Sequence, residues 1–186
     1  CNKSGYLTVD RIFAFLSLHC VQNLDITSLS KFEANQMTFL SIDQIETPLG
    51  PMIAIGNKQA LYLLEFSARR NIKHEIEKLQ TVSQASIISG KTDSIDSIRK
   101  ELQQYFKGEL SYFQTPLKMT GTSFQIQVWL RLKKIPFGTT CSYSDIAQEI
   151  QKPTSIRAVG GANAANQLAI VIPCHRVVSS RGELTG

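Results

Sequence analysis

The feature that most constrains this chain is the sequence PCHRV at residues 173–177, which directly follows five apolar residues. That run, residues 168–172, has the length of a buried strand, and the proline after it cannot donate to a sheet ladder. We therefore expect Cys174 at the end of a buried strand, at the rim of a core. The histidine and arginine that follow favour the thiolate, which is the reactive form of cysteine. The alternative is that Cys174 is a small buried apolar residue.

Composition and charge describe a globular protein with an uneven charge distribution. The chain has 186 residues, a length that suffices for one large or two small domains. Of these residues, 42% are hydrophobic and 19% are charged, as in an ordinary globular protein. Its net charge is +5, and residues 118–186 account for all of it, with eight Lys or Arg against three Asp or Glu. This asymmetry favours a polyanionic partner for the C-terminal part. A solvated basic face is the alternative.

The cysteines give no indication of a metal site or a disulfide framework. Their spacing contains no C-x-x-C pair and no zinc-ligand cluster, so we expect no metal, no cofactor and a reducing cytoplasmic location. The four are Cys1, Cys20, Cys141 and Cys174. No run approaches transmembrane length, and residues 12–18 lack the flanks of a signal peptide. Because the first residue is not Met, we expect a fragment of a longer chain.

Hydrophobic patterns predict an α/β domain over residues 37–115, whereas residues 1–36 cannot be assigned. A hairpin is expected around residues 56–59, where turn residues separate two apolar strands. Predicted strands lie at 37–45, 52–55 and 61–66, and predicted helices at 71–79 and 93–108. We see no recognisable site in this domain and interpret it as support for the rest of the chain.

The second half of the chain predicts a mostly helical domain over residues 118–186. A helix begins with Thr122 or Ser123 as its N-cap and ends before the PFG sequence at 136–138. Two short helices follow, at about 144–150 and 156–165, and the tight turn between them suggests a helix-turn-helix unit.

The helix predicted at 156–165 carries almost no side-chain bulk. Gly160 and Gly161 are adjacent in it, although glycine costs up to about 1 kcal/mol relative to alanine in a helix. Arg157 is its only long charged residue. A slim helix with one arginine fits insertion into a nucleic-acid groove. Close packing against a neighbouring helix is the alternative.

Taken together, these segments resemble the O6-alkylguanine-DNA alkyltransferase family, also called methylated-DNA–protein-cysteine methyltransferases. The resemblance runs in the family's order from about residue 38 to 186 and is closest to the bacterial adaptive-response branch. The matching blocks are ETPLG (46–50), SFQIQVW (123–129), TTCSY (139–143), RAVGGAN (157–163), Asn166 and IPCHRVV (172–178).

The resemblance implies an N-terminal RNase H-like α/β domain followed by a winged-helix-like, mostly α C-terminal DNA-binding domain. It implies that a monomer binds double-stranded DNA containing O6-alkylguanine, and O4-alkylthymine as well, away from any membrane and without a cofactor. The damaged base would be flipped out of the duplex, because its O6 atom faces the interior. The alkyl group would move to Cys174, which is then permanently spent.

The resemblance also assigns roles around the cysteine. His175 would act as base toward the Cys174 thiol through a water, with a core histidine as the alternative. Asn166 would join the helix to the active-site strand and donate a hydrogen bond near the thiol, or would be a helix C-cap. Tyr143 would crowd the DNA phosphate and give a proton to the departing guanine oxygen, or would be a half-buried core tyrosine.

DNA contacts are assigned to the slim helix in the minor groove. Arg157 would fill the space that the flipped base leaves; a phosphate contact or a surface salt bridge is the alternative. Arg176 would contact a phosphate or have a structural role. The small residues expected against the DNA are Ala158, Gly160, Gly161 and Ala162.

Family members continue beyond Gly186 into a tyrosine-glycine loop and a glutamate that orients the histidine, so we expect a chain ending here to transfer alkyl groups poorly. Two other functions stay open: a non-catalytic module that binds alkylated DNA, and a Cys-His hydrolase. The cysteine argues against the first. Adjacent Cys174 and His175, without an oxyanion-hole motif, argue against the second.

Overall fold

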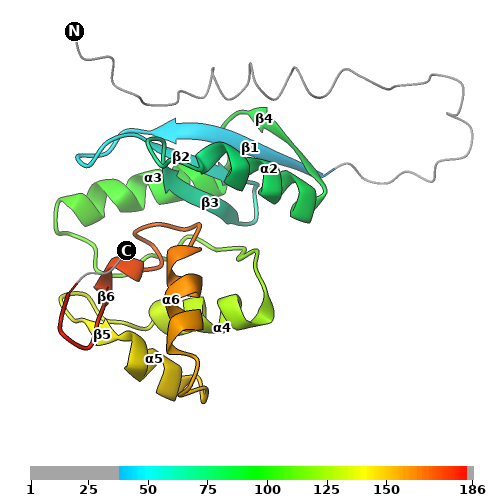
Figure 1. Cartoon of the computed structure of the whole chain (residues 1–186). Helices are drawn as coiled ribbons and strands as arrows, with labels where there is room; N and C mark the ends of the chain where they lie inside the picture. Colours follow the sequence, from blue (N-terminus) through cyan, green and yellow to red (C-terminus); the bar gives the residue numbers. More distant parts are fainter. Residues whose placement is uncertain (1–37, 184–186) are drawn as a thin grey trace, which may run out of the picture.

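The computed structural model describes residues 38–183, so the unassigned segment 1–36 lies outside the described residues. Figure 1 shows an α/β domain stacked on a smaller helical domain, in the order predicted from the sequence. No helix within residues 38–183 is long and apolar enough to cross a membrane.

The N-terminal domain is built on a four-stranded sheet in the order β3-β2-β1-β4. Its strands are β1 (Thr38–Ile45), β2 (Met52–Gly56), β3 (Leu61–Phe66) and β4 (Ala85–Ser89). The first three are antiparallel, which confirms the hairpin, while β4 pairs with β1 in parallel. We did not predict β4, because its five residues directly follow a helix without any turn signal.

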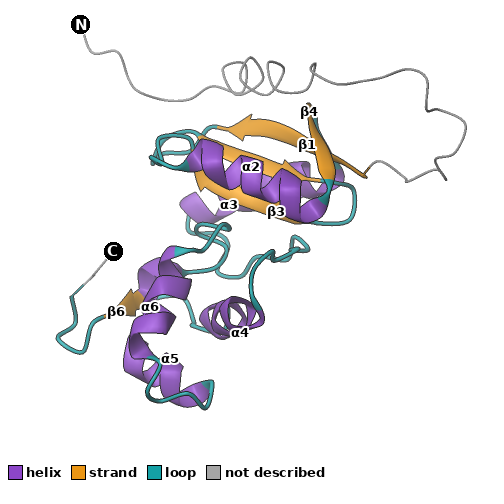
Figure 2. Cartoon of the chain, turned by 45° about the vertical axis from the view of Figure 1, so that its right-hand side comes forward, coloured by secondary structure: helices purple, strands orange, loops and turns teal. Residues whose placement is uncertain are grey.

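One helix covers each face of this sheet, as Figure 2 shows. The helices are α2 (Ile72–Ser83) and α3 (Asp93–Phe106). Alternate residues of β2 point to opposite faces, so Ile53 packs in the core with α2 while Met52 packs in the core with α3. The α3 side of the sheet faces the second domain.

Three helices form the C-terminal domain, and side-chain caps fix the start of two of them. These helices are α4 (Ser123–Leu132), α5 (Tyr143–Glu149) and α6 (Ile156–Ala164). Capping boxes open α4 at Thr122 and α5 at Ser142, and each supplies partners for backbone N–H groups that a helix start leaves unpaired. The three helices predicted for this domain are confirmed, each beginning within one residue of its predicted start. A two-stranded parallel ladder joins β5 (Cys141–Ser142) to β6 (Val177–Val178).

The strand predicted at residues 168–172 is wrong. These residues are buried, as expected, but only Leu168 makes a β-bridge, to Leu64 of β3. The chain then turns sharply: Ile170 has a φ of 71°, and the Ile172 N–H donates to the Leu168 carbonyl at 2.9 Å. The run is apolar because it is a buried turn between the two domains.

A single hydrophobic core joins the two domains. It contains β-strand residues such as Leu64, helix residues such as Trp129 and Val159, and the turn residues Leu168 and Ile172. The N-terminal domain therefore supports the turn that leads to Cys174.

Candidate functional site

Cys174 is the first residue of a short 3-10 helix, η2 (Cys174–Arg176), and its side chain is half-buried. Its N–H donates to the Ile172 carbonyl at 2.8 Å. The helix runs directly into β6, so the thiol is fixed on both sides by hydrogen-bonded backbone. A held, partly accessible thiol is what an acceptor of a transferred group requires.

Two asparagines hold the backbone on either side of the thiol. Asn166, 3% exposed, donates from Nδ2 to the Ile172 carbonyl at 2.9 Å and accepts the Leu168 N–H at 3.0 Å. The predicted link between helix and active-site segment is therefore present, although Asn166 bonds backbone rather than the thiol. Asn163 of α6 donates to the carbonyl of Cys174 itself at 3.4 Å. Asn163 ends the RAVGGAN block but was not among the predicted site residues.

His175 follows the thiol and is more than a third exposed. The pKa of its imidazole lies below the ordinary value, first because partial burial disfavours the charged ring and second because Arg176 is nearby. The ring is therefore neutral at physiological pH, which is the form that accepts a proton. This environment suits the role of base better than that of a buried core histidine.

The exposed face of α6 has free space around its two glycines, Gly160 and Gly161. Apart from its chain neighbours and the backbone of α6 itself, no heavy atom of the described residues lies within 4 Å of where a Cβ on Gly161 would stand. For Gly160 the nearest such atom is Tyr143 Cε1 at 3.9 Å. Packing among residues 38–183 therefore does not require either glycine, which argues against close helix packing as the reason for them. Ala158 is exposed on the same helix. The small residues instead leave a shallow surface that an external partner can approach.

Ala162 does not belong to this surface, contrary to our prediction. It is 3% exposed, and its carbonyl accepts a 2.7 Å hydrogen bond from the indole Nε1 of Trp129. Its small side chain lets α6 approach α4. A helix period of 3.6 places Ala162 three residues after buried Val159, so the two face the core together.

Arg157 and Tyr143 flank this shallow surface. Arg157 is the second residue of α6 and is exposed, without an ion pair to any residue in the described range. Tyr143 begins α5, is half-buried, and lies beside Gly160. Both residues therefore border the face that the glycines leave open.

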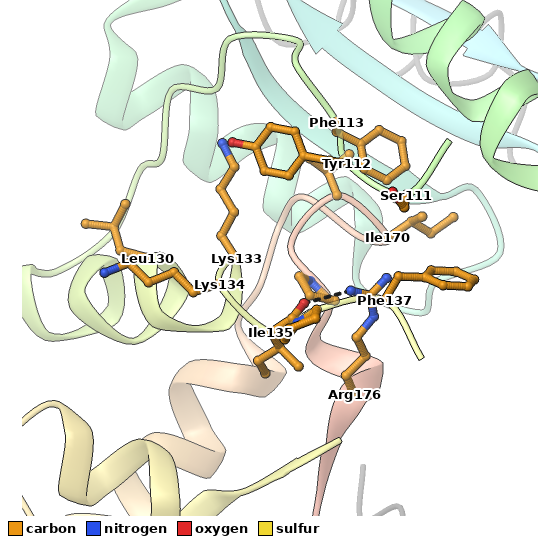
Figure 3. A pocket seen from close by; sticks show the side chains of 13 residues that line it. Ser111, Tyr112, Phe113, Leu130, Lys133, Lys134, Ile135, Phe137, Ile170 and Arg176 are labelled. Carbon is orange, nitrogen blue, oxygen red and sulfur yellow. Dashed lines mark hydrogen bonds between the residues drawn. The ribbon is translucent and has the colours of Figure 1, made fainter. Parts of the chain in front are cut away.

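Arg176 points away from that face. Its Nη1 donates to the Ile135 carbonyl at 2.8 Å, and its guanidinium lies 5.4 Å from the centre of the Phe137 ring. Arg176 lines a pocket of about 440 Å³ between the two domains. Figure 3 shows this pocket, in which Lys133 also lies over the Tyr112 ring. Of the two roles predicted for Arg176, these contacts match the structural one. Part of the positive charge of residues 118–186 is thus held against aromatic rings.

A second cavity of about 460 Å³ opens beside Cys174 and His175, and residues of the N-terminal domain line it as well. Among them are Glu65 of β3 and Arg69, which the sequence analysis missed. No motif marks these two residues. Only the folded chain brings them close to residues about a hundred positions later.

Comparison with known proteins matches both halves of the chain to one family. Residues 42–119 match the ribonuclease-like domain of 6-O-methylguanine DNA methyltransferase, and residues 123–186 match the DNA-binding domain of the same family. A methylated-DNA–protein-cysteine methyltransferase of Methanosarcina barkeri is 43% identical over 144 residues, covering 77% of this chain and 85% of the relative. The constitutive Bacillus subtilis enzyme of that name is 38% identical, covering 76% of this chain and 82% of its own length.

Solved structures agree with this match. The Mycobacterium tuberculosis O6-methylguanine methyltransferase superposes with a TM-score of 0.67 at 35% identity, covering 79% of this chain and 83% of the other. The same organism's protein in complex with DNA has a TM-score of 0.65 at 34% identity, covering 80% and 83%.

Proposed function

Because the chain belongs to the 6-O-methylguanine DNA methyltransferase family, we propose that it repairs duplex DNA by moving the alkyl group of O6-alkylguanine to the Sγ atom of Cys174. The observation that carries this proposal is the placement of that thiol. It is half-buried at the start of η2, directly after a turn held by Asn166 and beside a neutral His175.

The reaction is one in-line displacement. The Cys174 thiolate attacks the alkyl carbon, a carbon–sulfur bond forms, and the carbon–O6 bond breaks with its electron pair going to the guanine oxygen. The guanine then gains a proton, for which Tyr143 is the proposed donor. A thioether is not displaced under these conditions, so each chain reacts once.

His175 is the proposed base that takes the thiol proton. Its lowered pKa keeps the imidazole neutral, and a neutral ring nitrogen can accept the proton directly or through a water. Deprotonation is useful here because the thiolate is the nucleophile.

DNA docks on the shallow face of α6 in this proposal. The exposed Ala158 and Gly161 let the helix approach the floor of the minor groove, and Arg157 enters the stack in place of the flipped base. O4-alkylthymine is a second proposed substrate, and the chain acts as a monomer.

The test is transfer of radiolabel from an oligonucleotide duplex that contains O6-[³H-methyl]guanine. We expect up to one label per chain, bound to the peptide that contains Cys174. Cys174→Ser should abolish transfer, whereas Cys141→Ser, which changes the other described free cysteine, should not.

Two results would contradict the proposal. Tight binding of the damaged duplex without transfer would favour a non-catalytic sensor of alkylated DNA. Continuous turnover of an ester or peptide that depends on Cys174 would instead favour a hydrolase.

A further inference from the structure

Arg69 lies just after β3 and joins the N-terminal domain to the end of α6. Its Nη2 donates to the Ala164 carbonyl at 2.8 Å, and its Nη1 donates to the Asn166 carbonyl at 3.3 Å. The same guanidinium is paired with Glu65, and its Nε lies 3.1 Å from Glu75. One side chain therefore contacts two carboxylates of its own domain and two backbone oxygens of the other.

The α6 helix has no cation of its own at this end. The last carbonyls of a helix lack partners within the helix and carry the negative end of its dipole. No basic residue occupies the last turn of α6. Arg69 supplies a donor to the Ala164 carbonyl, the last of α6, and brings positive charge to this end from the other domain.

The carboxylates hold the guanidinium in place. Glu65 is 4% exposed and accepts its second hydrogen bond from the Phe66 N–H at 2.9 Å. The side chain of Glu75 is 15% exposed. Burial raises the pKa of both glutamates above the ordinary value, and the nearby charge of Arg69 offsets part of that rise. A guanidinium bound on two sides by acids has little freedom to leave the end of α6.

The backbone beside Arg69 also holds the turn that leads to the thiol. The Leu64 N–H donates to the Gln167 carbonyl at 2.9 Å, and the Ala169 N–H donates to the Leu64 carbonyl at 2.8 Å. From there the Asn166 side chain reaches the Ile172 carbonyl, two residues before the cysteine. The end of α6 and the start of the active-site turn are thus attached to one short stretch, residues 64–69.

We propose that Arg69 is a positioning residue for alkyl transfer, which fixes the DNA-binding helix α6 relative to the Sγ atom of Cys174. This inference rests on the proposed function. Attack on the alkyl carbon requires the bound base and the sulfur in line, and an error of about 1 Å in such an arrangement can cost roughly a hundredfold in rate. The contacts of Arg69 go to two carboxylates and to the Ala164 and Asn166 carbonyls, and the proposed DNA-binding surface is the exposed face of α6. Its loss should therefore slow the transfer step and spare both duplex binding and thiol reactivity.

The experiment compares wild type with Arg69→Ala in three measurements. They are the single-turnover rate of methyl transfer at saturating damaged duplex, the Kd for undamaged duplex, and the iodoacetamide labelling rate of Cys174. We expect the transfer rate to fall about tenfold or more, and the other two quantities to change less than about twofold. Arg69→Lys should restore part of the rate, because an ammonium keeps the charge but lacks the planar fork. The control is Arg70→Ala, which removes the exposed neighbouring arginine.

A second variant covers the case in which Arg69→Ala does not fold, since it leaves Glu65 buried without its partner. The double substitution Glu65→Met with Arg69→Met removes the pair together and keeps the volume, a change that proteins often tolerate. It still lacks the donors to α6, so the same selective fall in transfer rate is expected.

The outcomes separate this inference from the function on which it depends. Wild-type transfer rates in the folded Arg69 variants would overturn it, as would an equal fall in transfer, binding and thiol labelling, which would show only a structural role. Failure of the wild-type protein to transfer the methyl group would overturn the proposed function instead.

Discussion

Gly161 offers a test in which stability and DNA binding move in opposite directions. Apart from its chain neighbours and the backbone of α6, a Cβ at this position meets no described heavy atom within 4 Å, and the residue is exposed within the helix. Glycine inside a helix is less stable than alanine by about 0.5–1 kcal/mol. Gly161→Ala should therefore stabilise the fold by that amount, which for a chain of this size raises Tm by roughly 1–4 °C.

A larger side chain at the same position should weaken DNA binding. Gly161→Leu adds four carbons to the shallow face of α6, and these would stand between the helix and the floor of a groove. We expect the Kd for undamaged duplex to rise about tenfold, equivalent to about 1.4 kcal/mol, while Tm stays at or above that of wild type. Calorimetry gives the first quantity and thermal melting the second.

The control is Thr81→Leu, which places the same leucine side chain at an exposed position of α2 on the other domain. It should leave DNA affinity unchanged. If Gly161→Leu bound duplex as tightly as wild type, α6 would not be the docking surface. If Gly161→Ala melted at a lower temperature than wild type, Gly161 would be required for internal packing. That result would refute the claim that its surroundings are open.

Three other predictions follow from the site. Asn166→Ala removes the buried hydrogen bonds of the active-site turn and should cost about 1–3 kcal/mol in urea denaturation; a loss within error would contradict that role. Arg176→Gln removes a charge that lowers the pKa of His175, so that pKa should rise and the acid limb of the transfer-rate profile should move to higher pH. If the acid limb did not move, His175 would not be the base whose titration limits the rate. Burial raises the pKa of Cys141 and Arg131 opposes it, so Arg131→Met should raise that pKa further. Iodoacetamide labelling of Cys141 in the variant should then require higher pH, and an unchanged pH profile would refute the assignment.

Local signals were sufficient where a few neighbouring residues decide the structure. Thr122 and Gln125 form the capping box at the start of α4, and both lie within four residues of each other. The β2–β3 hairpin likewise depends on a short turn between two apolar runs. In such cases the sequence contains both partners of the stabilising interaction side by side, so the pattern predicts the element.

The prediction of a strand at 168–172 failed for a physical reason. An apolar run of five residues fits a buried strand and a buried turn equally well, because both need apolar side chains. What decides between them is the Asn166 side chain, which satisfies the backbone of the turn, together with the left-handed Ile170. A β-branched residue at positive φ is rare. Such outliers gather at functional sites, and this one lies four residues before the proposed acceptor, Cys174.

The contacts between the two domains could not be predicted from local sequence patterns either. The N-terminal domain has no recognisable catalytic motif, so it was predicted only to support the rest of the chain. Yet Leu64 holds the 167–169 segment by two backbone hydrogen bonds, and Arg69 holds the end of α6. These contacts join residues about a hundred positions apart, so no local pattern could reveal them.

A thiol that reacts only once gains nothing from a site that opens and closes repeatedly for product release. It gains from a rigid arrangement in which α6, the proposed DNA-binding helix, and the sulfur keep a constant separation until a damaged base arrives. The shared hydrophobic core and the Arg69 contacts provide such rigidity, because both α6 and the turn before Cys174 are attached to β3 and the residues just after it. On this argument the N-terminal domain is part of the reaction geometry, and substitutions at its contact with α6 should slow transfer even where the cysteine, the histidine and the DNA-binding face are intact.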